Sequence, residues 1–452
     1  MPGPRQKPSW TQDTAKTATP GGEELYRDGA EDTTELPVTS WFLRWAGAYW
    51  SPRTVPSYVN EKIAYFSLAA IGGAPVVAMA LYGLPPHPLV VPAYFAGCGL
   101  AQRALLKAWP RNVCASSFPP LDGKVVIVTG GSSGLGRATC AGLLRRGATV
   151  VTTYHTSTAE ATAEGIAALL PANLREADGK DLVEQGRLTA WPLDLADNKS
   201  IVKFANTVKQ KFPRGVDVLV NNAGTRCGLE CETVASGCER SVQVNCVGPF
   251  YLTELLAHSV QARGGRVVHL VSSNHRLAAD YSLAMDPSRF VKFFCVNKYL
   301  TPGDPETFFG ERLLRVSYFV RMCHVRSLAD RGVNAVAVNP GHYVATQLRR
   351  HIYPTLGTQH FYKTLFLTMR TPKEGAQGVL HACAAPAGDP TLDLKGGYHY
   401  NCRAKPRGVS RFVPKMTDAV VNWLVQLCRM PLYRPPSFDK KPQDGASGSG
   451  PS

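Results

Sequence analysis

Several patterns are absent from this 452-residue sequence, and each absence excludes a class of protein. Its 12 cysteines form no Cys-x-x-Cys pair, and the spacing of Cys227, Cys231 and Cys238 does not suit a zinc ribbon. We therefore expect no metal site, and reduced thiols in a reducing compartment. The net charge is +16, but the chain has no dense Lys/Arg block or zinc-finger spacing. We expect no nucleic-acid partner, and the basic charge instead favours solubility and attraction to anionic membrane lipid.

The N-terminal region divides into two parts of different composition. Residues 1–40 are polar from the start, which excludes an ordinary secretory signal, and we predict a disordered arm. In residues 41–113, aromatic side chains cluster over 41–50, and no Lys, Arg, Asp or Glu lies between Lys62 and Arg103. We predict a hydrophobic, membrane-associated helical segment there.

Three arrangements suit this hydrophobic segment. Residues 63–84 are long enough to cross a bilayer core, which takes about 20 residues, and an interfacial piece would then follow. Alternatively, residues 63–100 form a helical hairpin that turns at the prolines of residues 85–88, or a helical pair packed on the next domain of a soluble protein. Basic residues flank both ends, which favours a hairpin with the following domain facing the cytoplasm.

The remaining chain predicts one large domain and a short C-terminal region. Strand and helix patterns alternate over residues 121–402, which is typical of an α/β fold with a Rossmann-type, doubly wound parallel sheet. Residues 403–436 contain one amphipathic helix, expected over 417–428, and residues 437–452 form a disordered Gly/Ser/Pro tail.

The strongest motif lies at the start of this domain. A buried strand, Val125–Val128, runs into a glycine-rich turn, and a helix follows near residue 135. Gly130, Gly134 and Gly136 would allow the tight turn and close backbone approach that a pyrophosphate needs, while the helix N-terminus supplies N–H donors. Strand, turn and helix in this order predict a dinucleotide site.

The spacing Thr129-Gly130-x-x-x-Gly134-x-Gly136 resembles the short-chain dehydrogenase/reductase family. Further motifs of that family follow in order: Asp194-Leu195 resembles the pair that contacts adenine, and Asn221-Asn222-Ala223-Gly224 matches the Asn-Asn-Ala-Gly motif. Asn339-Pro340-Gly341 resembles the loop beside the nicotinamide, and residues 371–377 and 396–398 resemble the retinol-dehydrogenase-like branch. The resemblance implies a cofactor site made by Gly130, Ser132, Ser133, Gly134, Leu135, Gly136, Asp194, Leu195, Asn222, Ala223, Gly224, Pro340, Gly341 and Thr346.

Cofactor preference depends on the end of the second predicted strand, residues 149–153. Enzymes that use NAD carry an acid there, which binds the ribose 2′-hydroxyl. Here Tyr154, His155 and Thr156 follow, with no carboxylate, and His155 stands where similar NADP enzymes carry Arg. We therefore predict NADP(H) in preference to NAD, with His155 in the site.

The family's catalytic Tyr-x-x-x-Lys motif does not occur between Ser273 and Pro340. In that motif the lysine charge lowers the tyrosine pKa from about 10 toward working pH. Two alignments remain open. In the favoured one, Leu314 replaces the tyrosine and Tyr318 the lysine, and Tyr318 could act only if the helix were shifted. In the other, residues 294–298 carry the motif with Phe in place of Tyr, although Gly and Pro residues would interrupt that helix.

The resemblance still implies a substrate-binding serine, Ser273, at the end of the strand predicted over 267–273, and a relay asparagine, Asn245. Both residues equally suit a purely structural role at strand and helix ends. His275, Tyr281 and Lys298 are further candidate acids.

Two functions follow from this partial site. The first is a membrane-associated, NADP(H)-dependent oxidoreductase that moves hydride to or from a lipophilic alcohol or carbonyl, with Ser273, Asn245 and Tyr318 as catalytic candidates. The alternative is a catalytically impaired pseudoenzyme, a nucleotide-binding scaffold or sensor at a membrane. By analogy with the family, a homo-oligomer is expected.

Overall fold

The computed structural model describes residues 118–170, 176–177, 180–226, 232–276, 306–341, 370–405 and 413–430, with single residues 97, 278, 344, 348 and 409. The predicted arm and C-terminal tail lie outside the described residues, as does the hydrophobic segment apart from residue 97. Within the described part of the chain, no helix is long and apolar enough to cross a membrane.

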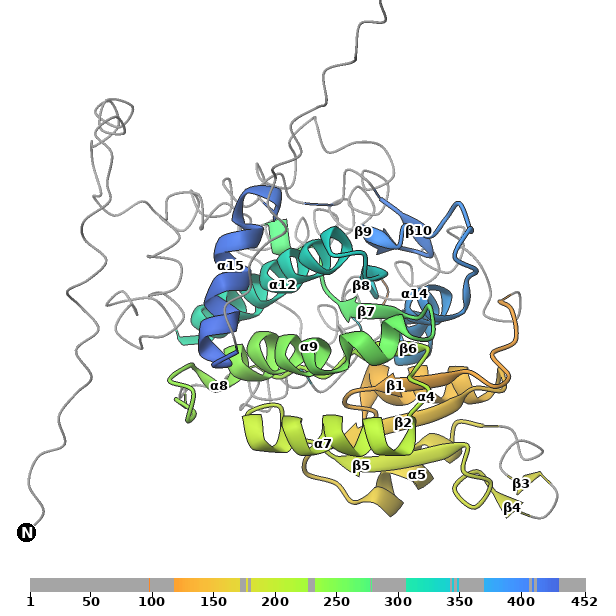
Figure 1. The fold of residues 1–452 in the computed structure, drawn as a ribbon. Helices are drawn as coiled ribbons and strands as arrows, with labels where there is room; N and C mark the ends of the chain where they lie inside the picture. Colours follow the sequence, from red (N-terminus) through yellow and green to blue (C-terminus); the bar gives the residue numbers. More distant parts are fainter. Residues whose placement is uncertain are drawn as a thin grey trace, which may run out of the picture. The chain divides into compact units, whose positions relative to one another are not determined.

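An eight-stranded sheet forms the centre of the domain (Figure 1). Its order is β10-β9-β8-β7-β6-β1-β2-β5, and every pairing is parallel except that of β9 with β10. The strands are β1 (Val125–Val128), β2 (Thr149–Tyr154), β5 (Leu188–Pro192), β6 (Val218–Asn221), β7 (Arg266–Leu270), β8 (Ala335–Asn339), β9 (Lys395–Tyr400) and β10 (Arg403–Ala404). The predicted doubly wound parallel sheet is thus confirmed. A small separate sheet pairs β3 (Glu176–Ala177) with β4 (Lys180–Asp181).

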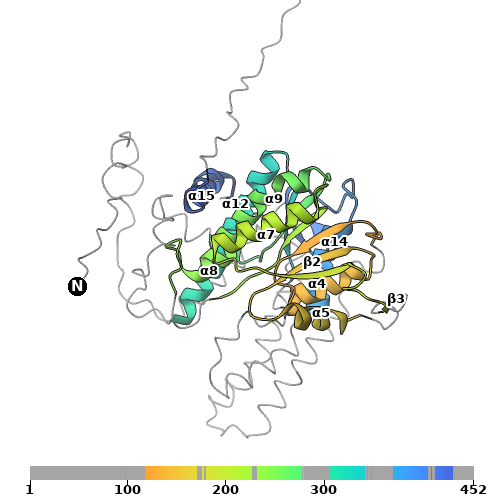
Figure 2. The same ribbon diagram turned by 60° about the horizontal axis from the view of Figure 1, so that its bottom comes forward.

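Helices cover both faces of the sheet (Figures 1 and 2). On one face lie α7 (Asn198–Lys211), α9 (Gly248–Gln261), α12 (Glu306–Asp330) and α15 (Val413–Leu427), and on the other α4 (Gly134–Leu144), α5 (Ala159–Ala167) and α14 (Pro372–Ala384). Alternate strand residues supply the two cores: Ile127 packs with the first set, and Val126 and Val128 with the second. This period of two explains the continuous apolar strands, since both faces are buried.

The topology fixes where a ligand binds. Chain order reverses beside β1, because β2 and β5 lie on one side of it and β6 on the other. In such sheets the ligand crevice lies beyond the carboxyl ends of the strands at this reversal. The loops after β1 and β6 therefore define the expected site.

Candidate active and cofactor site

The glycine-rich turn after β1 has the geometry that its sequence predicts. Gly130 and Gly134 have φ angles of 70° and 51°, a region that favours glycine. A Cβ added to Gly136 would lie 2.2 Å from the carbonyl oxygen of Gly130, so the turn leaves no room for a side chain. The N-cap residue of α4, Ser133, makes no side-chain capping bond. The helix N-terminus thus keeps N–H donors for an anion.

The loop after β6 holds this turn in place. Asn222 donates from Nδ2 to the carbonyl oxygens of Thr129 and Gly130, at 2.8 and 3.2 Å. The Thr129 hydroxyl accepts from the backbone N–H groups of Asn222 and Ala223, at 3.1 and 3.0 Å. Asn222 therefore supports the turn with its side chain. The tight turn and open helix end together fit the diphosphate of a dinucleotide.

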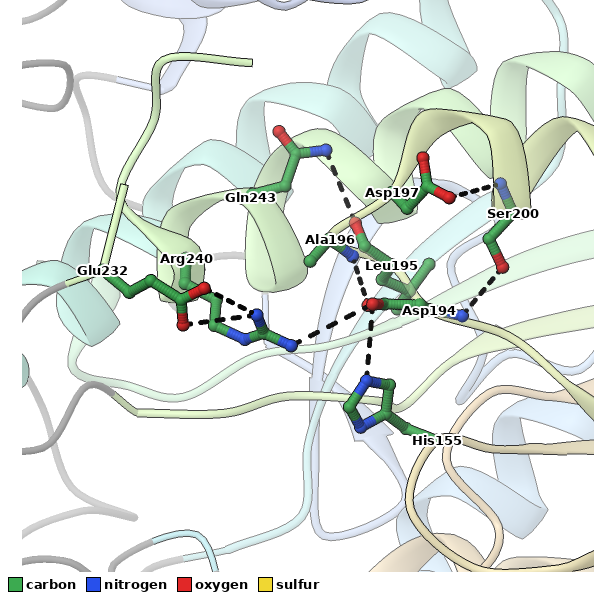
Figure 3. Close-up of polar contacts among 9 residues, drawn as sticks. All are labelled: His155, Asp194, Leu195, Ala196, Asp197, Ser200, Glu232, Arg240 and Gln243. Carbon is green, nitrogen blue, oxygen red and sulfur yellow. Dashed lines mark hydrogen bonds and ion pairs between the residues drawn. The ribbon is translucent and has the colours of Figure 1, made fainter. Parts of the chain in front are cut away.

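At the other end of the expected site, Asp194 joins two basic side chains (Figure 3). His155 Nε2 lies 3.4 Å from Asp194 Oδ2, and Arg240 Nη2 lies 4.0 Å from the same oxygen. Arg240 also pairs through Nη1 with Glu232, at 3.1 Å. The other carboxylate oxygen of Asp194 accepts from the Ala196 N–H at 2.8 Å.

Sequence reasoning identified His155 and Asp194 but not Arg240. Arg240 begins α8 (Arg240–Val242), which comes to the carboxyl end of β5 only in the folded chain. No motif marks it. Leu195 is buried, and its carbonyl accepts from Gln243 Nε2 at 3.4 Å, which ties this loop to the segment after α8.

Ser273 lies just beyond β7, in a turn. The strand ends at Leu270, so the predicted strand over 267–273 was too long at its carboxyl end. The turn is closed by the His275 N–H, which donates to the Ser272 carbonyl at 3.1 Å. The Ser273 residue is 7% exposed, and its Oγ is buried without a hydrogen-bond partner among the residues that the structure describes. A buried hydroxyl left unpaired is costly, and it is ready to bind a ligand oxygen.

Asn245 lies in η3 (Gln243–Val247), a π-helical turn that leads into α9. Its Oδ1 accepts from the Thr225 N–H at 2.8 Å, and its Nδ2 donates to the Thr225 carbonyl at 2.7 Å. The Asn245 carbonyl accepts from Arg321 Nε at 2.7 Å. All three polar groups have protein partners, so the observed contacts are those of a structural residue.

Helix α12 carries the residues of the favoured alignment. Leu314 is 6% exposed, and Tyr318 is partly buried against the core on the α12 side of the sheet. The Ser317 hydroxyl donates to the Leu313 carbonyl at 2.8 Å. Leu314 offers no proton donor, so the position expected for the family's tyrosine is apolar. The second alignment, over residues 294–298, lies outside the described residues.

His275 is fully buried and its ring lies 5.2 Å from that of Tyr398. Its Nδ1 lies 2.6 Å from the Ser272 carbonyl, an acceptor, so this nitrogen carries the proton. The contact anchors His275 to the turn that holds Ser273.

The loop after β8 has a close-packed glycine. Gly341 has a φ of 108°, and an added Cβ would lie 2.6 Å from the Arg370 guanidinium. Arg370 Nη1 donates to the Pro340 carbonyl at 3.4 Å and to Asn401 Oδ1 at 2.9 Å. Arg370, another residue that no motif marked, therefore fixes the predicted nicotinamide loop. Thr346, Tyr281 and Lys298 lie outside the described residues.

Comparison with known proteins shows which family the chain belongs to. A family profile described as short chain dehydrogenase matches residues 124–282. Retinol dehydrogenase 14 from Mus musculus is 30% identical over 311 residues, which are 67% of this chain and 83% of that protein. Polyprenol dehydrogenase from Mus musculus is 30% identical over 331 residues, 71% of this chain and 89% of that protein. The chain belongs to the short-chain dehydrogenase family, and it is an oxidoreductase of that family, whose members act on alcohols and carbonyls.

One solved structure is similar to this chain over part of its length. A short-chain dehydrogenase/reductase from Serratia marcescens is 24% identical, with a TM-score of 0.42, and the match covers 62% of this chain and 96% of that one.

Proposed function

We propose that this protein is a membrane-associated, NADP(H)-dependent oxidoreductase that interconverts a lipophilic alcohol and the corresponding carbonyl compound. The observation that carries the proposal is the buried hydroxyl of Ser273 at the carboxyl end of the sheet, which has no hydrogen-bond partner in the described part of the chain. The bound nicotinamide would accept or deliver the hydride, and the hydroxyl proton that the reaction releases or consumes would be exchanged with solvent water. Ser273 Oγ would donate to the substrate oxygen, polarise the carbonyl carbon and hold it in place.

The substrate class rests on likeness and on the apolar N-terminal sequence. The relatives are described as retinol and polyprenol dehydrogenases, so long-chain isoprenoid alcohols and aldehydes form the first test panel. Wild-type protein is expected to oxidise or reduce members of this panel, and Ser273→Ala to lose about a hundredfold or more in kcat/KM. Turnover that is unchanged in Ser273→Ala would refute the assigned role of this hydroxyl.

The preference for NADP(H) rests on the groups at the end of β2. Residues 154–156 include no carboxylate, and the half-exposed His155 and Arg240 lie close together because both are within 4.0 Å of Asp194 Oδ2. We expect wild type to bind NADPH more tightly than NADH, and His155→Ala to lose about tenfold of that discrimination, or ~1.4 kcal/mol. His258→Ala, an exposed histidine in the last turn of α9, is the matched control. Equal affinity of wild type for the two cofactors would refute the preference.

Membrane association rests on the uncharged stretch between Lys62 and Arg103. Full-length protein in isolated membranes is expected to resist carbonate extraction, with its domain open to protease from the cytoplasmic side. Release into the soluble fraction would refute the anchor. Light scattering of the detergent-solubilised protein tests the proposed homo-oligomer.

A second candidate function is a nucleotide-binding scaffold without turnover. It is supported by the apolar Leu314 and by Asn245, whose side-chain oxygen and nitrogen both bond Thr225. NADPH binding without turnover on the substrate panel would favour the scaffold over the enzyme.

A further inference from the structure

One buried cation joins the segments that surround the nicotinamide end of the expected site. Arg321, on α12, is 4% exposed. Its Nε donates to the Asn245 carbonyl at 2.7 Å, and its Nη1 donates to the carbonyls of Asn221 and Leu270 at 3.1 and 2.8 Å. Its Nη2 donates to the Ala223 carbonyl at 2.8 Å.

These four carbonyls belong to three separate segments at the carboxyl edge of the sheet. Asn221 ends β6, and Ala223 lies in the loop that holds the glycine-rich turn. Leu270 ends β7 and precedes the turn that carries Ser273. Asn245 lies in the π-helical turn. A single planar guanidinium therefore sets the relative positions of the cofactor loop, the substrate serine and the asparagine turn.

The Arg321 guanidinium is hard to replace because of the number and geometry of its hydrogen bonds. A guanidinium has five N–H donors in a rigid fork, and four of them are used here. Burial lowers the pKa of Arg321, yet the group stays charged and its bonds to carbonyls are charge-assisted. In the described part of the chain, no carboxylate pairs with Arg321, so carbonyl dipoles balance its charge.

We propose that Arg321 is a positioning residue for the nicotinamide half of the cofactor site. It supplies a fixed cation on the helix whose Tyr-x-x-x-Lys motif is missing, one turn after Tyr318. The inference rests on the proposed dinucleotide binding, and it holds for both the enzyme and the scaffold.

The test separates a local role from general stability. Two ligands are compared by calorimetry: NADPH, and 2′-phospho-ADP-ribose, which lacks the nicotinamide. Arg321→Lys is expected to weaken NADPH binding about tenfold and to weaken binding of the fragment by a smaller factor, because the loop after β6 supports the diphosphate turn while the Ser273 turn and the asparagine turn do not. Arg331→Gln is the matched control, because Arg331 directly follows the last residue of the same helix and bonds Glu254 at 2.8 Å, away from the four carbonyls. This control is expected to lower Tm without changing either affinity.

A second readout needs no ligand. In hydrogen–deuterium exchange of the cofactor-free protein, Arg321→Lys is expected to speed exchange in residues 221–226 and 271–275, whereas Arg331→Gln leaves these segments unchanged. Unchanged exchange there, equal weakening of both ligands, or unchanged NADPH affinity in folded Arg321→Lys would overturn the proposal. If wild type binds neither nucleotide, the proposed function fails, and the exchange experiment still decides whether Arg321 braces these segments.

Discussion

Replacing Gly136 by alanine tests whether the tight turn after β1 is needed for both folding and cofactor binding. The added Cβ would lie 2.2 Å from the Gly130 carbonyl oxygen and 2.4 Å from Asn222 Nδ2. The first distance is about 1 Å short of an ordinary C···O contact of ~3.3 Å. Because one of the two atoms is backbone, the turn itself must shift.

The expected cost follows from two opposing effects. Overpacking of this kind costs about 1–3 kcal/mol, and disturbing the Asn222 bond to Thr129 adds about 1 kcal/mol. Alanine returns up to ~1 kcal/mol through helix propensity. A net loss of about 1–3 kcal/mol corresponds to a decrease in Tm of roughly 3–10 °C for a domain of this size.

Thermal unfolding with and without NADPH measures both quantities, because a ligand raises Tm according to its concentration and Kd. Gly136→Ala is expected to lower Tm and to lose most of the NADPH-induced increase. Gly378→Ala in α14 is the matched control, since its Cβ would meet Val338 Cγ1 at an ordinary 3.4 Å. The control is expected to keep the NADPH effect and gain up to ~1 kcal/mol. If Gly136→Ala has the same Tm and the same NADPH-induced increase in Tm as wild type, this account of the turn is refuted.

Three other perturbations test the interior of the domain. Burial lowers the pKa of His269 well below its usual value. The free energy of unfolding should therefore fall as pH drops below about 6.5, by up to ~1.4 kcal/mol per pH unit from this group. A His269→Gln variant whose free energy of unfolding falls with pH as steeply as that of wild type would contradict this. Burial opposes ionisation of Glu254, but hydrogen bonds from His324 and Arg331 outweigh it and lower its pKa to about 2. Glu254→Gln should cost about 3 kcal/mol at pH 7 in urea unfolding, and the difference from wild type should shrink between pH ~4.3 and 2. Asn245→Ala should cost about 1–3 kcal/mol, and an unchanged urea midpoint would argue against its structural role.

The fold was predictable where sequence patterns are local. Buried strands and a glycine-rich turn are encoded in consecutive residues, so β1, the turn and α4 lie where the sequence predicts them. The end of β7 at Leu270 was not predictable, because Val271 is as apolar as the strand residues before it and its N–H still donates to the Val338 carbonyl of β8 at 2.8 Å. Hydrophobicity marks burial, and it does not mark where strand pairing stops.

The supporting residues of the site were not predictable, because they act across long sequence separations. Arg321 bonds carbonyls 51 to 100 residues away, and Arg240 meets Asp194 only through the packing of α8 beside β5. In sequence, each is one arginine among many. Asn245 matched a family motif, yet its contacts to Thr225 are visible only in the folded chain.

The most direct test of the central claim follows the hydride itself. NADPH that carries deuterium at the transferred position is incubated with full-length protein and a lipophilic aldehyde, and the alcohol product is analysed by mass spectrometry. We predict that wild type transfers one deuterium to the product carbon. Ser273→Ala should still bind NADPH but lose this transfer. No deuterium in the product, under conditions where calorimetry shows NADPH bound to wild type, would contradict the oxidoreductase and leave the scaffold in its place.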